Sequence, residues 1–414
     1  MTKIKLKRKK PEETNNEHLI KFLSPSEEKW KLLEVPRDDE ENDLKKEIRK
    51  NQQFLRDNLL SALQMPNLMV LAGSGTSLGE VKGPSMADLW DKTTKQTVTF
   101  EYEEDGELKK LEIEPNDIIK KVKYDSEDEN IEALLTKCES YLQVENDLTV
   151  ESFLIEAKKI ILDACSIFLE DKNLGGHRIF LHRLSKRRVR DPRLKIFTTN
   201  YDLCFERAAV LQGLIILDGF SFVHPRRYDP NFFNYDIVRR SQKSDDSTNF
   251  LEGVVQLFKL HGSVNWERNN NEVTEKVEPN PENACIIYPA QGKYQQSYIQ
   301  PHLELFSQYL SSLRNPNTCL IISGFGYNDD HLSEPIISAI DTNPQLKIII
   351  ADYKAEDSLN CGNKYWQKLK RRAKNGEDVW FVNASFKEFA ERIPDLKALT
   401  SAQKLEKAIK EVSS

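Results

Sequence analysis

The chain has 414 residues and a formal net charge of −6, with 30% charged and 39% hydrophobic residues. This balance is enough to bury a core, and it argues against nucleic-acid binding through overall charge. No apolar run is long enough to span a bilayer, and the first residues lack the apolar stretch of an export signal. We therefore expect a cytoplasmic protein without membrane contact.

The six cysteines lie far apart, and no two of them are separated by only two residues. Such close pairs are the usual ligands of a structural zinc module, so we expect no zinc. Free thiols in a reducing compartment are the simplest interpretation.

The two ends of the chain are polar. Residues 1–40 are rich in Lys, Glu and Asn and predict a flexible N-terminal arm, whose basic start could also contact a partner or nucleic acid. A helix is expected over residues 42–64, before Pro66. Residues 396–414 predict one C-terminal amphipathic helix.

Short apolar runs alternate with helical patterns, which is typical of an α/β fold with a doubly wound, Rossmann-like parallel sheet. This domain is expected over residues 41–79 and 195–395. Its strands are expected at residues 68–71, 195–199, 254–260, 318–323, 346–352 and 378–383.

Residues 80–194 interrupt the alternation and predict a mostly helical insertion domain. Helices are expected over residues 130–142 and 150–169, and a hairpin over residues 97–113 with its turn at Asp105-Gly106. Residues 263–300 are rich in Asn, Glu and Pro and predict irregular loops over the sheet edge.

Polar segments follow the first two strands. Gly73-Ser74-Gly75-Thr76-Ser77 would let the backbone approach a pyrophosphate, with hydroxyls and the next helix as donors, although a plain turn is equally compatible. Thr199, Asn200 and Asp202 follow the next strand and should lie in the same crevice. Capping of the helix after them is the alternative, but it explains only one of Asn200 and Asp202.

Two later strands also end in polar segments. His261 follows one strand directly, and the alternative is a structural histidine. Gly324, Asp329 and His331 lie in a glycine-rich loop after the other strand. There Asp329 would bind a ribose or begin the following helix.

The segments GSGTS, TTNYD, KLHG and SGFGYNDDH, in this order, resemble the sirtuin family over residues 60–395. The resemblance implies NAD as substrate and a loop at Gly73–Ser77 that holds its phosphates, with Ser74 in place of alanine. It implies Asn200, Asp202 and His261 as catalytic residues. It also brings Thr199, Gly324, Asp329 and His331 to the NAD site.

Longer segments, FTTNYDLCFERAA, LFKLHGSVNW and ISGFGYNDDH, resemble the sirtuin subunit of the bacterial Sir–HerA antiphage defence system, also called Nezha. This resemblance implies a large, dodecamer-like ring that docks on a HerA-type ATPase, contacts DNA only indirectly and depletes NAD. Deacylating sirtuins carry a four-cysteine zinc module, and its absence from this sequence favours hydrolysis.

The predicted reaction converts NAD and water into ADP-ribose and nicotinamide. Nicotinamide leaves as a neutral base through an oxocarbenium-like transition state, so positioning and electrostatics dominate. Asn200 would hold water or ribose, His261 would act as general base, and Asp202 would orient the carboxamide or stabilise positive charge. The alternatives are a metal-dependent nuclease subunit of the same complex and a non-catalytic NAD or ADP-ribose sensor.

Overall fold

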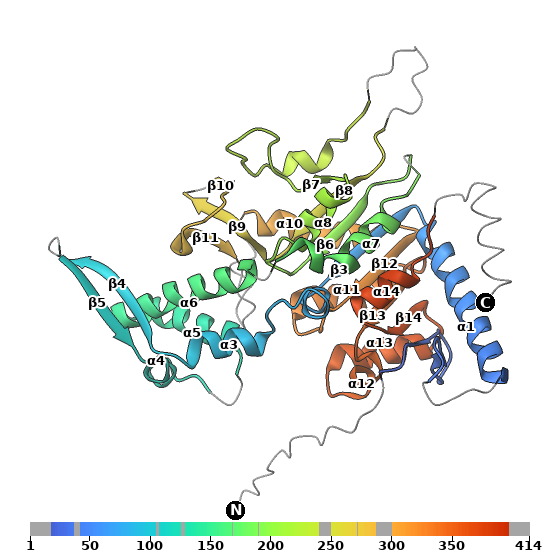
Figure 1. Cartoon of the computed structure of the whole chain (residues 1–414), viewed down its shortest axis with the longest axis horizontal. Helices are drawn as coiled ribbons and strands as arrows, with labels where there is room; N and C mark the ends of the chain where they lie inside the picture. The colour runs from blue at the N-terminus through green and yellow to red at the C-terminus, as the bar shows by residue number, and fades with distance from the viewer. Residues whose placement is uncertain are drawn as a thin grey trace, which may run out of the picture.

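The computed structural model describes residues 18–36, 42–104, 107–125, 129–167, 169–188, 190–239, 250–270, 272–286 and 300–396 (Figure 1). The predicted turn at Asp105-Gly106, the first 17 residues of the predicted arm and nearly all of the predicted C-terminal helix lie outside these ranges. Among the described helices, none combines the length and the apolar character needed to cross a membrane.

Within the described ranges, the central sheet has nine strands in the order β2-β1-β14-β13-β12-β3-β6-β8-β7. Its seven parallel strands include a three-residue edge strand that the sequence patterns did not predict. The doubly wound α/β fold is confirmed. The parallel strands are β3 (Asn67–Ala72), β6 (Leu194–Thr198), β7 (Ile215–Leu217), β8 (Val254–Lys259), β12 (Thr318–Ser323), β13 (Lys347–Asp352) and β14 (Val379–Asn383).

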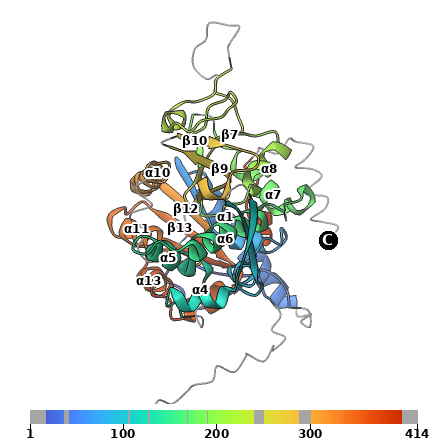
Figure 2. The same ribbon diagram turned by 90° about the vertical axis from the view of Figure 1, so that its left-hand side faces the viewer.

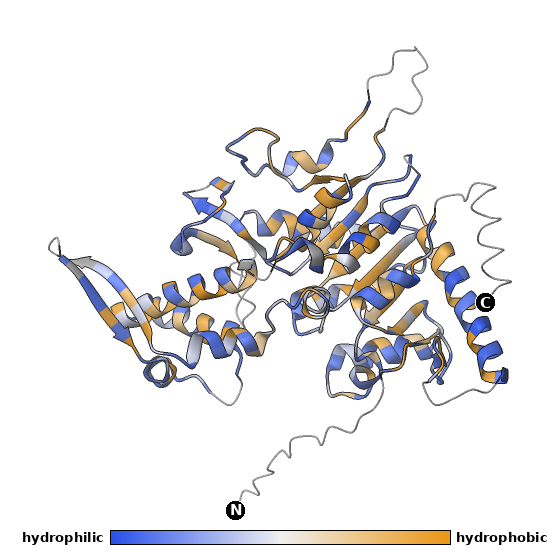
Figure 3. Ribbon diagram, in the orientation of Figure 1, coloured by the Kyte–Doolittle hydropathy of each residue, from blue (hydrophilic) through white to orange (hydrophobic). Residues whose placement is uncertain are grey.

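Helices cover both faces of this sheet, since alternate side chains of each strand enter opposite cores. In β3, Val70 joins one core and Leu71 the other. Strands and inward helix sides are correspondingly hydrophobic (Figure 3). The first face is covered by α1 (Asn42–Leu63), α7 (Gly175–Leu184), α8 (Cys204–Leu211) and α14 (Phe386–Arg392). The second is covered by α10 (His302–Arg314), α11 (Asp330–Thr342), α12 (Ala355–Asn360) and α13 (Lys364–Lys374).

The insertion forms a separate core to one side of the sheet (Figures 1 and 2). Its long helices are amphipathic and bury residues such as Leu134 and Phe153 against one another. The predicted hairpin is present, with Val98 opposite Ile113. The elements are α3 (Met86–Thr94), β4 (Val98–Glu104), β5 (Glu107–Ile113), α4 (Pro115–Lys121), α5 (Ile131–Leu142) and α6 (Leu148–Ile167).

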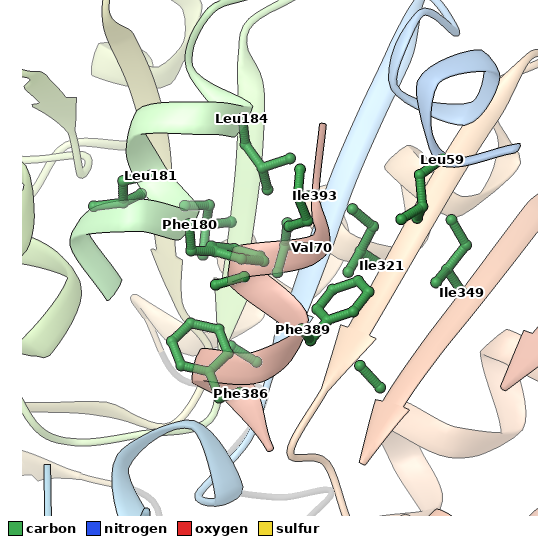
Figure 4. Packing of buried hydrophobic residues seen from close by; sticks show 14 of the residues in the cluster. Leu59, Val70, Phe180, Leu181, Leu184, Ile321, Ile349, Phe386, Phe389 and Ile393 are labelled. Atoms are coloured by element: carbon green, nitrogen blue, oxygen red, sulfur yellow. The ribbon is translucent and has the colours of Figure 1, made fainter. Parts of the chain in front are cut away.

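Helix α7 lies inside the predicted 80–194 insertion, but it packs in the main core. Its apolar face, with Phe180 and Leu184, meets Phe386 and Phe389 of α14 over the sheet (Figure 4). The separate core of the insertion therefore ends with α6, because α7 buries its apolar side in the main core, against α14 and the sheet.

Two segments predicted to be irregular contain strands. Residues 18–36, within the predicted arm, include β1 (Lys21–Leu23), which pairs antiparallel with β14, and β2 (Lys31–Leu32). Their anchors Phe22 and Leu33 are buried, and burial offsets the cost of ordering a polar segment. In the described residues 263–270 and 272–286, a small antiparallel sheet lies where irregular loops were expected. Its strands are β9 (Gly262–Asn269), β10 (Glu272–Glu275) and β11 (Ala284–Ile286).

His177 in α7 makes folding stability depend on pH. It is fully buried between the rings of Phe205 and Phe386, at 5.0 and 4.7 Å between centroids. Among the described residues neither ring nitrogen has a hydrogen-bond partner, and burial lowers the pKa from 6.5 to about 4. As pH falls below 6.5, the unfolded chain binds a proton that the folded chain does not, so stability is lost down to about pH 4.

We predict that this histidine lowers the free energy of unfolding by about 2 kcal/mol between about pH 7.5 and about pH 5. His177→Phe should remove that part of the pH dependence, because phenylalanine does not titrate. Urea unfolding of both proteins at the two pH values measures the difference. Equal pH dependence in the two proteins would show that folding does not lower the pKa of His177.

Candidate active site

Four loops meet where the adjacent strands β12, β3, β6 and β8 end. The chain order reverses between β3 and β12, and ligands of doubly wound sheets bind at this switch point. The loops and the insertion enclose a cavity of about 310 Å³. The sheet loops contribute Gly73, Ser74, Ser77, Thr199, Asn200, Tyr201, Asp202, His261, Phe325, Gly326, Asn328 and Asp329. The insertion side contributes Pro84, Met86, Leu89, Asn130, Glu132 and Cys165.

Glycines allow the β3 and β12 loops to touch. The Gly75 amide donates to the carbonyl of Gly324 at 2.9 Å, and a Cβ on Gly73 would lie 2.5 Å from that oxygen. Gly324 has a φ of +60°, which favours glycine. These glycines are therefore required for backbone packing, whatever ligand the loop binds.

Most backbone N–H groups of the predicted anion site are already hydrogen-bonded within the protein. Helix α2 (Gly75–Leu78) is a single turn, and the amides of Gly75, Thr76 and Ser77 already bond to loop carbonyls. The structure describes the whole segment Gly73–Ser77. In this segment, only the backbone amide of Ser74 makes no backbone hydrogen bond. Contacts to a phosphate would therefore depend on the exposed Ser74.

Asn200 and Asp202 are tied to the β3 loop. The Asn200 amide nitrogen donates to the hydroxyls of Thr76 and Ser77 at 3.0 and 3.1 Å, and its Oδ1 takes no part in these bonds. Asp202 accepts from the Ser77 hydroxyl at 2.8 Å through Oδ2 and from the Cys204 amide at 3.0 Å through Oδ1. Asp202 thus holds the start of α8 as well, whereas Asn200 presents Oδ1 as the atom that can meet a ligand.

The side chain of Lys259 supports the loop that carries Asn200 and Asp202. The sequence patterns did not identify this role. Its side chain is 2% exposed, and Nζ donates to the carbonyls of Tyr201 and Asp202 and to Glu206. Burial raises the pKa of Glu206, and the neighbouring Lys259 opposes that rise. The only sequence signal was a lysine within an apolar strand, two residues before His261.

His261 and Asp329 line the cavity, but His331 does not. The His331 ring stacks on His261 at 5.6 Å between centroids and lines a separate groove between α10 and α11. In this structure the His331 ring is connected to the cavity lining through its stacking on His261, and its predicted contact with NAD stays a prediction. Asp329 is at the N-cap of α11 without a capping hydrogen bond from its side chain.

A second cavity of about 640 Å³ lies on the other side of α2. It contains Gly75, Thr76 and Gly324, so the predicted NAD contacts are divided between two cavities that share one loop. It also contains Asp352, at the end of β13, whose pKa is raised by burial. Among the described residues, no group of three or more His, Cys, Asp or Glu side chains could hold a metal ion.

A doubly wound sheet with cavities at its switch point is the arrangement of nucleotide-binding α/β proteins. Residues 194–374 match the family model of the SIR2-like domain. A comparison with curated protein sequences finds no match.

Among solved structures, the chain is similar to a Sir2 homolog–NAD complex, with 12% identity, 86% of this chain and 94% of that chain covered, and a TM-score of 0.40. It is similar to a Sir2–p53 peptide–NAD⁺ complex, with 13% identity, 82% and 95% covered, and a TM-score of 0.36.

Proposed function

We propose that this chain is an NAD hydrolase that releases nicotinamide and ADP-ribose. The observation that carries the proposal is the meeting of Asn200, Asp202 and His261 in one cavity at the switch point of the sheet. The match of residues 194–374 to the family model of the SIR2-like domain supports it. The three side chains come from two different strand ends. Local capping explains only the hydrogen bond that the Cys204 amide donates to Asp202.

In this proposal, each of the two cavities binds one half of the dinucleotide. The nicotinamide ribose would occupy the smaller cavity, beside Asn200 and His261. The diphosphate would cross the loop at Ser74. The adenosine would enter the larger cavity, where the Asp352 carboxylate could accept hydrogen bonds from ribose hydroxyls.

Catalysis then follows from positioning and charge. As the C1′–N bond breaks, its electron pair goes to the nicotinamide nitrogen and positive charge develops on the ribose. The Asn200 Oδ1 would hold the ribose or the attacking water, and the Asp202 carboxylate would stabilise the charge. His261 would bind a ribose hydroxyl or take a proton.

Incubation of the purified chain with NAD, followed by chromatography, tests this function. We expect slow release of nicotinamide and ADP-ribose in equal amounts. Tight NAD binding without release would support a sensor instead. Mg²⁺-dependent DNA cleavage without nicotinamide release would favour the nuclease alternative.

We further propose that the chain works in antiphage defence as a homo-oligomer, in complex with a HerA-type ATPase. The support is the sequence resemblance of the FTTNYDLCFERAA, LFKLHGSVNW and ISGFGYNDDH segments. Because constant NAD consumption would harm the host, the isolated chain should be slow and the complex faster. The NAD incubation with and without a HerA-type ATPase measures this, and a fast isolated chain would contradict it.

A further inference from the structure

The insertion contributes an acidic side chain to the candidate active site. Glu132 at the start of α5 is 8% exposed and lines the same cavity as Asn200, Asp202 and His261. Glutamate side chains are seldom this buried in proteins. The four residues come from three separate parts of the chain, so folding alone brings Glu132 to the sheet loops.

The first turn of α5 holds Glu132 in place. The Asn130 side chain caps the helix by accepting from the Ala133 amide at 3.1 Å. Ile131 and Leu134 are fully buried in the core of the insertion. A side chain on an anchored helix keeps its direction better than one on a loop, as a proton-transfer group requires.

Cys165 of α6 lines the same cavity as Asp202 and Glu132, and the charges of both carboxylates act on its thiol. Burial, followed by the charges of Asp202 and Glu132, raises the pKa of its thiol to about 12. Both carboxylates therefore lie close enough to Cys165 for their charges to act on it. A cationic nicotinamide ribose between them would be stabilised by both charges.

We propose that Glu132 is the general base that takes a proton from the attacking water, an inference that rests on the proposed NAD hydrolysis. The water oxygen bonds to C1′ as the C1′–N bond breaks, nicotinamide leaves with the electron pair, and the water proton passes to the Glu132 carboxylate and then to solvent. Both oxygens of Asp202 accept hydrogen bonds, from the Ser77 hydroxyl and the Cys204 amide, and these bonds hold that carboxylate in place. In this mechanism His261 would bind the ribose hydroxyls.

Glu132→Gln tests this role, because it keeps the side chain's size and removes its basicity. We expect NAD hydrolysis to fall by about 100-fold or more. NAD binding by calorimetry and the melting temperature should stay at the parental values. Sodium azide should restore NAD consumption with ADP-ribosyl azide as product, since azide attacks C1′ without losing a proton. Glu151→Gln, an exposed change in α6 of the same insertion, should hydrolyse NAD at the parental rate.

A parental hydrolysis rate in Glu132→Gln would overturn the proposal. So would an inactive variant that binds NAD but forms no azide product, since Glu132 would then be needed for bond cleavage. If Glu132→Gln folds poorly, Glu132→Asp carries the test. Aspartate is shorter and moves the carboxylate away from the water, so we expect the rate of NAD hydrolysis to fall by at least about 10-fold, with rescue by azide. A parental rate of hydrolysis would overturn the proposed role of Glu132. A parent chain that releases no nicotinamide refutes the NAD hydrolase itself, a result distinct from all of these.

Discussion

Asn200→Ala and His261→Ala are each expected to reduce NAD consumption by about 100-fold or more. The first removes the Oδ1 proposed to meet the ligand, and the second removes the imidazole at the end of the neighbouring strand. Both side chains are at most 8% exposed and line one cavity, so solvent water does not replace the contacts that each side chain would make with the ligand. Nicotinamide release per hour, with each protein at equal concentration, measures the loss.

The controls for this pair are exposed residues of the same types. Asn231→Ala and His182→Ala lie outside both cavities and should retain the parental rate. Asn200→Ala also loses its bonds to Thr76 and Ser77, so a thermal melt must accompany the assay. Folded Asn200→Ala and His261→Ala proteins that release nicotinamide normally would refute the site.

Gly262→Ala is expected to destabilise the fold by about 2–5 kcal/mol. Gly262 has a φ of +85°, where a side chain is strained. A Cβ there would lie 1.9 Å from the carbonyl oxygen of Cys285, which is backbone and cannot turn away. Because His261 is the preceding residue, the displaced strand should also move the imidazole and slow nicotinamide release. Urea unfolding measures the first effect and the NAD assay the second.

Gly362→Ala is the matched control for Gly262→Ala. A Cβ at Gly362 meets no atom within 4 Å, so the change should alter the free energy of unfolding by no more than about 0.5 kcal/mol. If Gly262→Ala were as stable as this control, the close contact between β9 and β11 would be wrong.

The predicted sheet follows from local patterns, and so does the placing of its loops. Buried parallel strands are short apolar runs, and the polar segments after them can be read from sequence alone. Since parallel strands end at the same edge, Ser74, Asn200, Asp202 and His261 could be expected in one crevice. Strand β7 was missed because three residues at a sheet edge leave too short a pattern.

The sequence by itself determined the six longer parallel strands of the sheet, the order of their polar ends along the chain and the residue types at the candidate site. Only the tertiary structure decided that Lys259 supports the Asn200 loop, that His331 lies outside the cavity and that Glu132 lies inside it. These contacts join residues far apart in the chain. They depend on how the insertion and α11 pack against the loops, and local periodicity holds no information about such packing.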